Sequence, residues 1–139
     1  MLGLIRALLT DFRLTYLFIS HDLSVVRQVC DRIAIMYLGR IVELADAQRL
    51  FETPAHPYTR MLLEAAPRLA TGQDLGALPI HGEPPSPTAV PSGCAFRTRC
   101  PHAVALCAEA LPELEPVADG RAVACHRWRD LGAAPVASA

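Results

Sequence analysis

The sequence predicts an α/β fold that ends in a small, irregular cysteine-rich extension. The run TYLFIS at 15–20 is uncharged, β-branched and aromatic, as in strands covered on both faces of a parallel sheet. Apolar residues recur at helical spacing on either side of this run, over 2–12 and 22–30. Four cysteines follow much later, at 94, 100, 107 and 125, after a connector rich in proline. Alternating strands and helices indicate an α/β core, whereas a short cysteine-rich segment has little apolar core of its own.

Each element of the core follows from a local pattern. Asp22 begins the second helical segment, where a carboxylate can cap free backbone N–H groups. RIAIMYLG and RIVELA are strand-like and meet in a hairpin at Gly39-Arg40. In chain order, the predicted elements are a helix at 2–12, a strand at 15–20, a helix at 22–30, strands at 32–39 and 40–45, and a short helix at 46–52.

The composition changes after residue 53. PAHPYTRMLLEAAP, at 54–67, predicts a helix with Pro57 in its first turn and Pro67 where it must stop. Residues 68–92 combine several prolines with Gly, Ser and Thr, which predicts an extended connector. The last nine residues, LGAAPVASA, predict a frayed tail.

Composition also excludes several function classes. The net charge is −1, so no basic face for a nucleic-acid partner is evident. All 13 basic residues are arginine. No secretory signal is visible, and no apolar run reaches the roughly 18 residues of a membrane span. We therefore expect a cytosolic chain, in which clustered cysteines favour metal binding over disulfides.

The strand at 15–20 leads directly into His21 and Asp22. Ligands of open α/β sheets bind beyond the carboxyl ends of the strands. At this edge His21 could donate a hydrogen bond to a phosphate oxygen or orient a water molecule. The alternative, that His21 merely caps the following helix, fits these residues equally well.

The longer string LFISHDLSVVRQVCDRIAIMYLGRIVE resembles the end of the ATPase core of ABC transporters, a P-loop NTPase fold. The matching pieces are the strand, SHD, a helix that ends before DRI, and MYLGRIVE. The resemblance implies that His21 is the switch histidine, which contacts the γ-phosphate of ATP. It also implies that Asp22 helps to organise the neighbouring loop across the nucleotide sandwich. Both roles suit phosphoryl transfer, which depends mainly on positioning and electrostatics.

Three other parts of such an ATPase are not found in this sequence. A P-loop requires GxxxxGK[ST], and the chain contains no lysine. An apolar strand ending in Asp-Glu and an LSGGQ-like signature are also missing. In the family all three precede the switch histidine, so the resemblance implies the C-terminal portion of a longer subunit. We expect ATP and Mg to be bound by the intact subunit, and this segment alone not to hydrolyse ATP.

A second group of motifs narrows the resemblance. PAHPYT before a helix, LPIHGEPPSPTAVPSGCAFRTRCPHAVALC and ACHRW are similar, in this order, to the oligopeptide and dipeptide branch of ABC importers, which includes nickel-uptake relatives. In physical terms, His56-Pro57-Tyr58 is expected to start a helix and pack a tyrosine. The resemblance implies the end of the nucleotide-binding core at 1–53, an HPY-type helix and linker at 54–78, a cysteine-rich extension at 79–130 and a disordered tail at 131–139.

The same resemblance implies partners and a location. The intact subunit would couple ATP hydrolysis to the import of peptides or a similar solute. It would dock on transmembrane permease subunits, pair with a second ATPase subunit, and be served indirectly by a solute-binding protein. It would be peripheral, on the cytoplasmic face of the plasma (inner) membrane.

The four late cysteines have the spacing C-x5-C-x6-C-x17-C. Structural zinc sites bring ligands in pairs about two to four residues apart, whereas a larger cluster accepts wider spacing. The resemblance points the same way, because importer ATPases of this type can carry a four-iron, four-sulfur cluster here. It implies that the ligands are Cys94, Cys100, Cys107 and Cys125.

Two alternatives to this cluster stay open from the residues alone. One is zinc, with His102 or His126 in place of a cysteine; the other is disulfides or plain buried thiols. Arginines flank the cysteines, at 97, 99, 127 and 129, and would lower thiol pKa values or simply lie on a solvated surface. In either metal case, binding would supply folding free energy to the extension.

Two other functions compete with that of an importer subunit. The chain could be a stand-alone metal or redox module in which the strands are only a scaffold, or a non-functional remnant. Coding DNA directly upstream that encodes a P-loop, a signature motif and an Asp-Glu strand would favour the importer.

Overall fold

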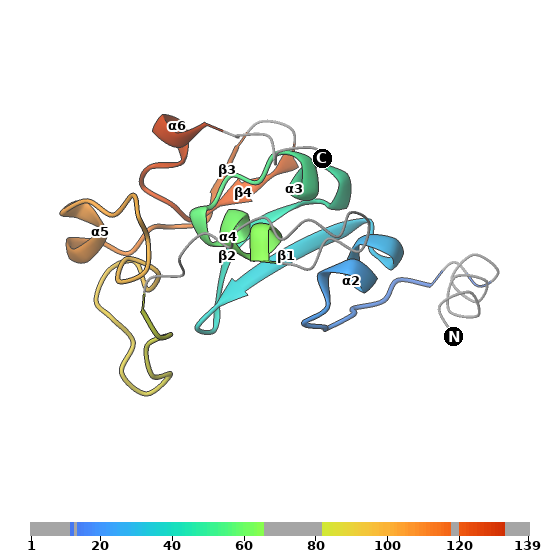
Figure 1. Ribbon diagram of the computed structural model, residues 1–139. Coiled ribbons are helices and arrows are strands. Elements are labelled where there is room, and N and C mark those ends of the chain that lie inside the picture. Colours follow the sequence, from blue (N-terminus) through green and yellow to red (C-terminus); the bar gives the residue numbers. More distant parts are fainter. Residues whose placement is uncertain (1–11, 13, 66–81, 118–119, 133–139) are drawn as a thin grey trace. The chain divides into compact units, whose positions relative to one another are not determined.

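The computed structural model describes residues 12, 14–65, 82–117 and 120–132. The chain divides into two units, Met1–Asp31 and Arg32–Ala139, which we call the first and second unit (Figure 1). The predicted helix at 2–12 lies outside the described residues apart from residue 12, as do much of the connector and most of the tail.

The first unit contains helix α2 (Leu23–Val29), which confirms the helix predicted over 22–30. Asp22 is its N-cap. The Asp22 Oδ1 atom accepts hydrogen bonds from the backbone N–H of Ser24 at 2.9 Å and of Val25 at 3.3 Å. These donors are orphaned at the start of any helix, so the predicted capping role of Asp22 is confirmed.

The predicted strand at 15–20 is wrong for the described structure. Residues 14–20 adopt neither helix nor strand, and Leu17 and Ile19 are each 88% exposed. A strand exists only through hydrogen bonds to a neighbouring strand, and the described residues of the first unit include no such neighbour. The apolar run therefore marks a surface suited to burial, which its composition could predict, but not the partner that would bury it.

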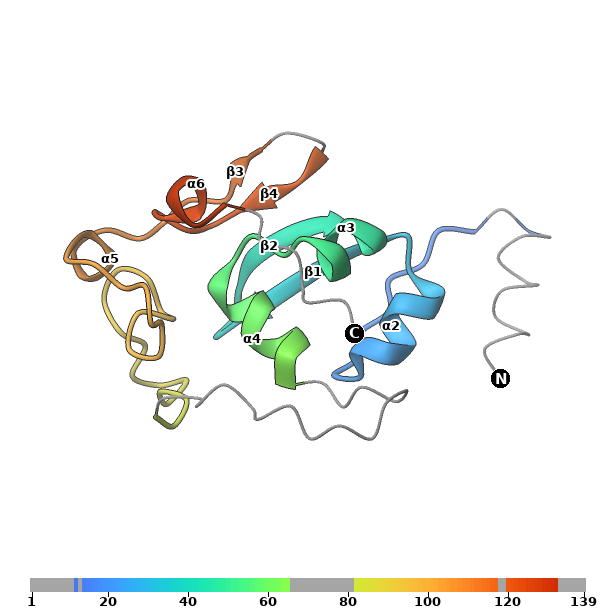
Figure 2. The same cartoon turned by 45° about the horizontal axis from the view of Figure 1, so that its top comes forward.

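The second unit is built on a four-stranded sheet in the order β1-β2-β4-β3 (Figure 2). All described strand pairs are antiparallel, so these residues form no parallel sheet. The presence of helices with this sheet agrees with the predicted α/β class. The strands are β1 (Arg32–Tyr37), β2 (Arg40–Asp46), β3 (Glu115–Pro116) and β4 (Ala122–Val123).

The predicted hairpin between the first two strands is confirmed, with its turn one residue earlier than expected. Leu38 and Gly39 have φ values of +44° and +79°. Positive φ at both central residues is what a two-residue type I′ turn requires. A bulge follows: Ile35 lies opposite Glu43 and Met36 opposite Ile41, so one extra residue is inserted in β2.

One face of the β1–β2 hairpin is buried. Ile33, Ile35 and Tyr37 are each 5% exposed, whereas Met36, on the other face, is 59% exposed. Glu43 pairs with Ile35 and is itself fully buried, so a carboxylate lies on the apolar face of the sheet. Such a group needs hydrogen-bond donors in its surroundings.

The described residues of the second unit form four short helices. They are α3 (Ala47–Glu52), α4 (Pro57–Ala65), α5 (Leu106–Glu109) and α6 (Trp128–Leu131). The first two confirm the predicted short helix at 46–52 and the helix that begins at Pro57, while α5 and α6 were not predicted. No helix in the described ranges is long and apolar enough to cross a membrane.

The side chain of Glu43 accepts hydrogen bonds from two backbone N–H groups just before α4. Its Oε1 accepts a hydrogen bond from the Ala55 N–H at 2.8 Å, and its Oε2 accepts one from the His56 N–H at 2.9 Å. The His56 Nδ1 accepts a hydrogen bond from the Tyr58 N–H at 3.0 Å, which caps the helix. The expected helix-start role of His56 is therefore confirmed.

Aromatic packing joins α4 to the hairpin and to the cysteine-rich segment. The Tyr58 ring centroid lies 4.6 Å from that of Tyr37 in β1 and 5.3 Å from that of Phe96. Tyr37 and Phe96 pack edge to face at 5.3 Å. The packed tyrosine predicted for the HPY sequence is thus present, and it connects three parts of the second unit.

Candidate functional site

His21 and Asp22 follow the segment 14–20 and lie directly before α2. The Ser24 hydroxyl donates to Asp22 Oδ1 at 2.6 Å, and the Asp22 N–H donates to the Ser20 hydroxyl at 3.0 Å. The Ser24 hydroxyl, followed by the backbone N–H groups of Val25 and Ser24, lowers the pKa of Asp22. Asp22 therefore fixes the turn that carries His21, whose side chain is exposed to solvent.

The four predicted ligand cysteines lie together in the second unit and line one cavity. Cys94 and Cys100 flank the turn that carries Phe96, Cys107 lies on α5, and Cys125 follows β4. The sheet makes this convergence possible, because β4 pairs with β2 and so carries Cys125 to the rest of the extension.

Three of the cysteines share one local geometry. Each begins a turn in which its carbonyl accepts a hydrogen bond from the N–H three residues on, and its sulfur accepts one from the N–H two residues on. The carbonyl bonds are Cys94–Arg97 at 3.1 Å, Cys100–Ala103 at 3.3 Å and Cys125–Trp128 at 3.4 Å. The donors to sulfur are Phe96, His102 and Arg127. N–H groups directed at sulfur favour its thiolate form.

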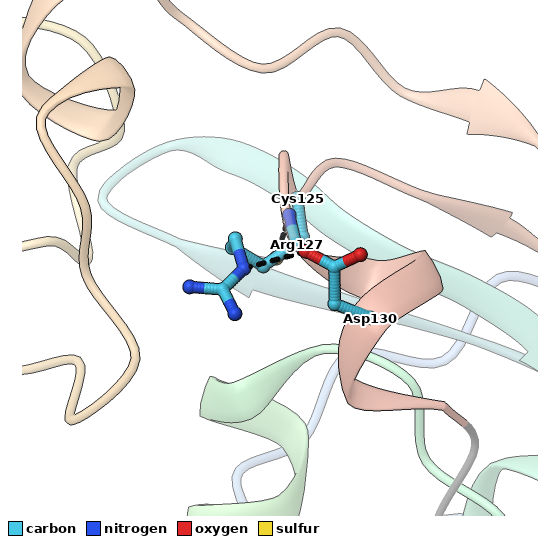
Figure 3. Close-up of polar contacts among 3 residues, drawn as sticks. All are labelled: Cys125, Arg127 and Asp130. Atoms are coloured by element: carbon cyan, nitrogen blue, oxygen red, sulfur yellow. Dashed lines mark hydrogen bonds and ion pairs between the residues drawn. The ribbon is translucent and has the colours of Figure 1, made fainter.

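Figure 3 shows the contact of Arg127 with Cys125 in this turn, together with the ion pair between Arg127 and Asp130. The Arg127 N–H donates to the Cys125 Sγ at 3.4 Å, and the Arg127 guanidinium forms an ion pair with Asp130 at 2.8 Å. Asp130 thus partly neutralises the positive charge of Arg127 within the same turn. The guanidinium therefore lowers the thiol pKa less than the sequence suggests.

Burial outweighs the neighbouring arginines in setting the thiol pKa values. The pKa of Cys125 is raised to about 11, mainly by burial and in smaller part by the three other cysteines, while the Arg127 N–H lowers it. Burial also raises the pKa of Cys94 and of Cys100, although Arg97 and Arg127 respectively lower them. A set of thiols that disfavours its own ionisation becomes a good ligand set only when a metal cation displaces the protons.

The histidines near this cavity are poorer candidates for ligands. The His56 Nδ1 accepts from Tyr58, and the ring also hydrogen-bonds the Ala124 backbone, so both of its nitrogens are engaged. The His126 Nε2 lies 2.9 Å from the Ala110 carbonyl oxygen and must be its donor. His102 is exposed. The thiols therefore form the main donor set.

The described thiols are gathered but not arranged around one point. Within the described ranges, no set of three or more His, Cys, Asp or Glu side chains has the geometry of a metal-ion site. The cavity volume of about 10 Å³ is enough for about one water molecule. A bound metal group would therefore require the cysteine side chains to rearrange around it.

Comparison with known proteins shows which proteins this chain resembles. The C-terminal region of oligopeptide/dipeptide transporters matches residues 42–107. A probable peptide ABC transporter ATP-binding protein of Sinorhizobium fredii is 50% identical over 90% of the chain, and the oligopeptide transport ATP-binding protein AppF of Bacillus subtilis is 45% identical over 91%. Over most of its length the chain is therefore similar to part of the peptide ABC transporter ATP-binding proteins.

The chain spans 35% of the length of the Sinorhizobium protein and 39% of that of AppF. A putative peptide import ATP-binding protein of Brucella ovis is 47% identical, also over 39% of its own length. The match to the oligopeptide/dipeptide transporter C-terminal region includes Cys94, Cys100 and Cys107, while His21 and Cys125 lie outside its limits.

Two residues of this transporter region were missed by sequence reasoning. The strand pattern of RIVELA does not distinguish Glu43, although a charged residue between apolar neighbours is itself a signal of a buried polar contact. The motif that contains Gly93 assigns this residue no role. Its glycine next to Cys94 hints at a special backbone conformation, but the contact that requires it joins residues distant in sequence.

Proposed function

We propose that the intact protein containing this chain is an ATP-binding subunit that powers uptake of oligopeptides or dipeptides. The proposal rests on relatives named as peptide transport or peptide import ATP-binding proteins, and on the match over residues 42–107. ATP and Mg would be bound by the intact subunit, whose P-loop lies outside this chain. The subunit would dock on transmembrane permease subunits at the cytoplasmic face of the inner membrane and pair with a second ATPase subunit, with a solute-binding protein delivering the solute.

In this proposal His21 contacts the γ-phosphate of ATP and Asp22 organises the loop around it. The exposed imidazole of His21, on a turn fixed by the Asp22 cap, supports the assignment. An imidazole N–H that donates to a phosphate oxygen stabilises charge there as the phosphoryl group is transferred. The exposed apolar residues of 14–19 would be covered by the part of the intact subunit that lies outside this chain.

We expect His21→Ala, in the intact subunit, to lower ATP turnover by about ten- to a hundred-fold, because a hydrogen bond to a charged group contributes about 1.5–3 kcal/mol. Steady-state phosphate release with purified subunit measures the effect. Gln28→Ala, at an exposed position on α2, serves as the control and should keep the turnover of the unsubstituted subunit. Full turnover in the His21 variant would remove the assignment.

The second part of the proposal places a four-iron, four-sulfur cluster on Cys94, Cys100, Cys107 and Cys125. The convergence of four thiols on one cavity is the observation that supports it. A single zinc ion needs every sulfur about 2.3 Å from one point, whereas a cluster takes one thiolate at each of four iron corners. The wide spacing of the cysteines and the engaged histidines favour the cluster over zinc.

The proposed division of the chain follows from these assignments. Residues 1–53 form the end of the nucleotide-binding core, 54–78 the HPY-type helix and linker, 79–130 the cysteine-rich extension and 131–139 the tail. The pairing of β4 with β2 supports an extension that folds onto the end of the core. A metal group would then stabilise this contact, since the extension has little apolar interior.

Anaerobic purification followed by iron, sulfide and zinc analysis tests the cluster. We expect about four iron and four sulfide per chain with visible charge-transfer absorption. Chelation should increase amide hydrogen exchange in 94–125 and leave α2 unchanged, since only the extension depends on the metal. A colourless protein with one zinc per chain would replace the cluster with a zinc site. A metal-free protein with unchanged exchange would contradict both.

A further inference from the structure

Gly93 lies between Ser92 and the first ligand cysteine, at a close backbone contact with α5. Its φ is +64°, a conformation that residues with a side chain rarely adopt. A Cβ atom at this position would lie 2.4 Å from the Cys107 carbonyl oxygen and 2.9 Å from both the carbonyl carbon and the oxygen of Ala108. All three atoms belong to backbone, so they cannot rotate aside as a flexible side chain could.

Hydrogen bonds on both sides of Gly93 hold this contact together. The Cys94 N–H donates to the Cys107 carbonyl at 2.8 Å, and the Ser92 hydroxyl donates to the Ala108 carbonyl at 3.1 Å. These carbonyls belong to the last residues of the short helix α5, where intrahelical partners are missing. The segment 92–94 therefore caps α5 and sets the backbone of Cys94 beside that of Cys107.

A side chain at residue 93 would have to lift this segment away from α5. The 2.8 Å bond between Cys94 and Cys107 would break, and the Cys94 thiol would move with its backbone. The other three cysteines are carried by different turns and by α5 itself, so they would not follow. Removal of this one close contact would thus separate one thiol from the remaining set.

We propose that Gly93 is a positioning residue for the thiolate site, which brings Cys94 into the ligand set by permitting the backbone contact with Cys107. This inference rests on the proposed metal site. It assigns Gly93 no contact with the metal group. Its effect on binding passes entirely through Cys94, so loss of the glycine should resemble loss of the Cys94 thiol.

The chain contains matched controls for this substitution. Gly82 and Gly120 have φ values of +75° and +72°, close to that of Gly93, but nothing lies within 4 Å of a Cβ built at either position. Gly82→Ala and Gly120→Ala therefore introduce similar backbone strain without the collision. If Gly93→Ala binds cluster more weakly than these two variants do, the difference is due to the lost contact with α5.

The experiment reconstitutes the full chain with ferric iron, a thiol reductant and sulfide under anaerobic conditions. We expect Gly93→Ala to retain cluster about ten- to a hundred-fold less tightly, the usual loss when a supporting residue of a metal site is changed. After oxidation with ferricyanide, residual cluster should give the electron paramagnetic resonance signal of an oxidised three-iron centre, as should the cluster of Cys94→Ser. Gly82→Ala and Gly120→Ala should match the unsubstituted chain. A merely structural loss would lower stability but leave the spectrum of bound cluster unchanged.

Failure of this inference is distinguishable from failure of the proposed metal site. If Gly93→Ala binds cluster with the affinity and spectrum of the unsubstituted chain, Gly93 has no positioning role, although the site stands. If no variant binds any cluster, the site is wrong, and hydrogen exchange of the Cys94 amide decides the positioning. Exchange accelerated about tenfold or more only in Gly93→Ala would support the contact, and equal exchange in all variants would overturn it.

Discussion

Glu43→Ala is expected to lower the free energy of unfolding of the second unit by about 3–5 kcal/mol. The substitution leaves the N–H groups of Ala55 and His56 buried without the acceptors that now lie at 2.8 and 2.9 Å. Each unsatisfied buried donor costs about 1–3 kcal/mol, and the lost side chain leaves a cavity in addition. The start of α4 would separate from β2, and with it the tyrosine that packs on Phe96.

Glu43→Gln separates hydrogen bonding from side-chain volume. The amide keeps one oxygen acceptor but presents an NH₂ group to the second N–H donor. Only one of the two backbone donors stays satisfied, so we expect a loss of about 1–3 kcal/mol, smaller than that of Glu43→Ala. The ranking of the two variants therefore tests whether both carboxylate oxygens contribute.

Urea unfolding followed by fluorescence of Trp128, the single tryptophan of the chain, measures both losses in the second unit. Glu115→Gln is the matched control. Glu115 forms only a 3.4 Å ion pair with Arg129, between side chains that are 52% and 73% exposed. Such pairs contribute little, so this variant should stay within about 0.5 kcal/mol of the unsubstituted chain. If Glu43→Gln were as stable as Glu115→Gln, the carboxylate would not anchor α4.

The elements predicted correctly are those specified by neighbouring residues. Asp22 caps α2 through donors two and three residues away, and Pro57 begins α4 as its fixed φ allows. The hairpin turn is also specified by neighbouring residues. Its exact position depends on Leu38, a residue type that is rarely expected at positive φ. Local chemistry was therefore enough to place these elements to within a residue or two.

The elements that were missed depend on distant residues. The run at 15–20 has strand composition, but a strand requires a partner that sequence spacing cannot supply. The strands β3 and β4 have two residues each, too few to show an alternating pattern. The convergence of Cys125 with Cys94 depends on the pairing of β4 with β2. Spacing and resemblance were enough to predict which cysteines are candidate ligands, whereas the backbone contact of Gly93 with α5 could not be predicted.

Acidification is expected to destabilise the second unit through His56, which is 1% exposed. Burial, the largest cause, lowers the pKa of His56 from 6.5 to about 4; the Ala124 backbone raises it and the Arg60 charge lowers it. Between pH 6.5 and pH 4 the unfolded chain binds a proton at this ring that the folded chain does not. The contribution of the neutral His56 ring to the free energy of unfolding is therefore fully present above pH 6.5. It decreases as the pH falls toward 4, by about 3 kcal/mol in total.

The structural reason for this dependence is the hydrogen bonding of the ring. The Nδ1 atom accepts from the Tyr58 N–H at 3.0 Å, and a protonated nitrogen cannot accept. Charging the ring would remove the cap of α4 and place a cation beside Arg60 in a buried site. Acid should therefore act on the same region as loss of Glu43, where the hairpin, α4 and the extension meet.

His56→Asn is the variant that isolates this effect. The asparagine oxygen can still accept from the Tyr58 N–H at a helix N-terminus, but the side chain does not titrate. Urea unfolding of both metal-free chains at pH 7.5 and pH 4.5 compares the change in stability rather than its absolute value. Carboxylates and cysteines are common to the two chains, so their contributions cancel. The unsubstituted chain should lose most of the additional 3 kcal/mol or so over this interval. Equal losses in the two chains would show that the His56 ring is not held neutral by its burial.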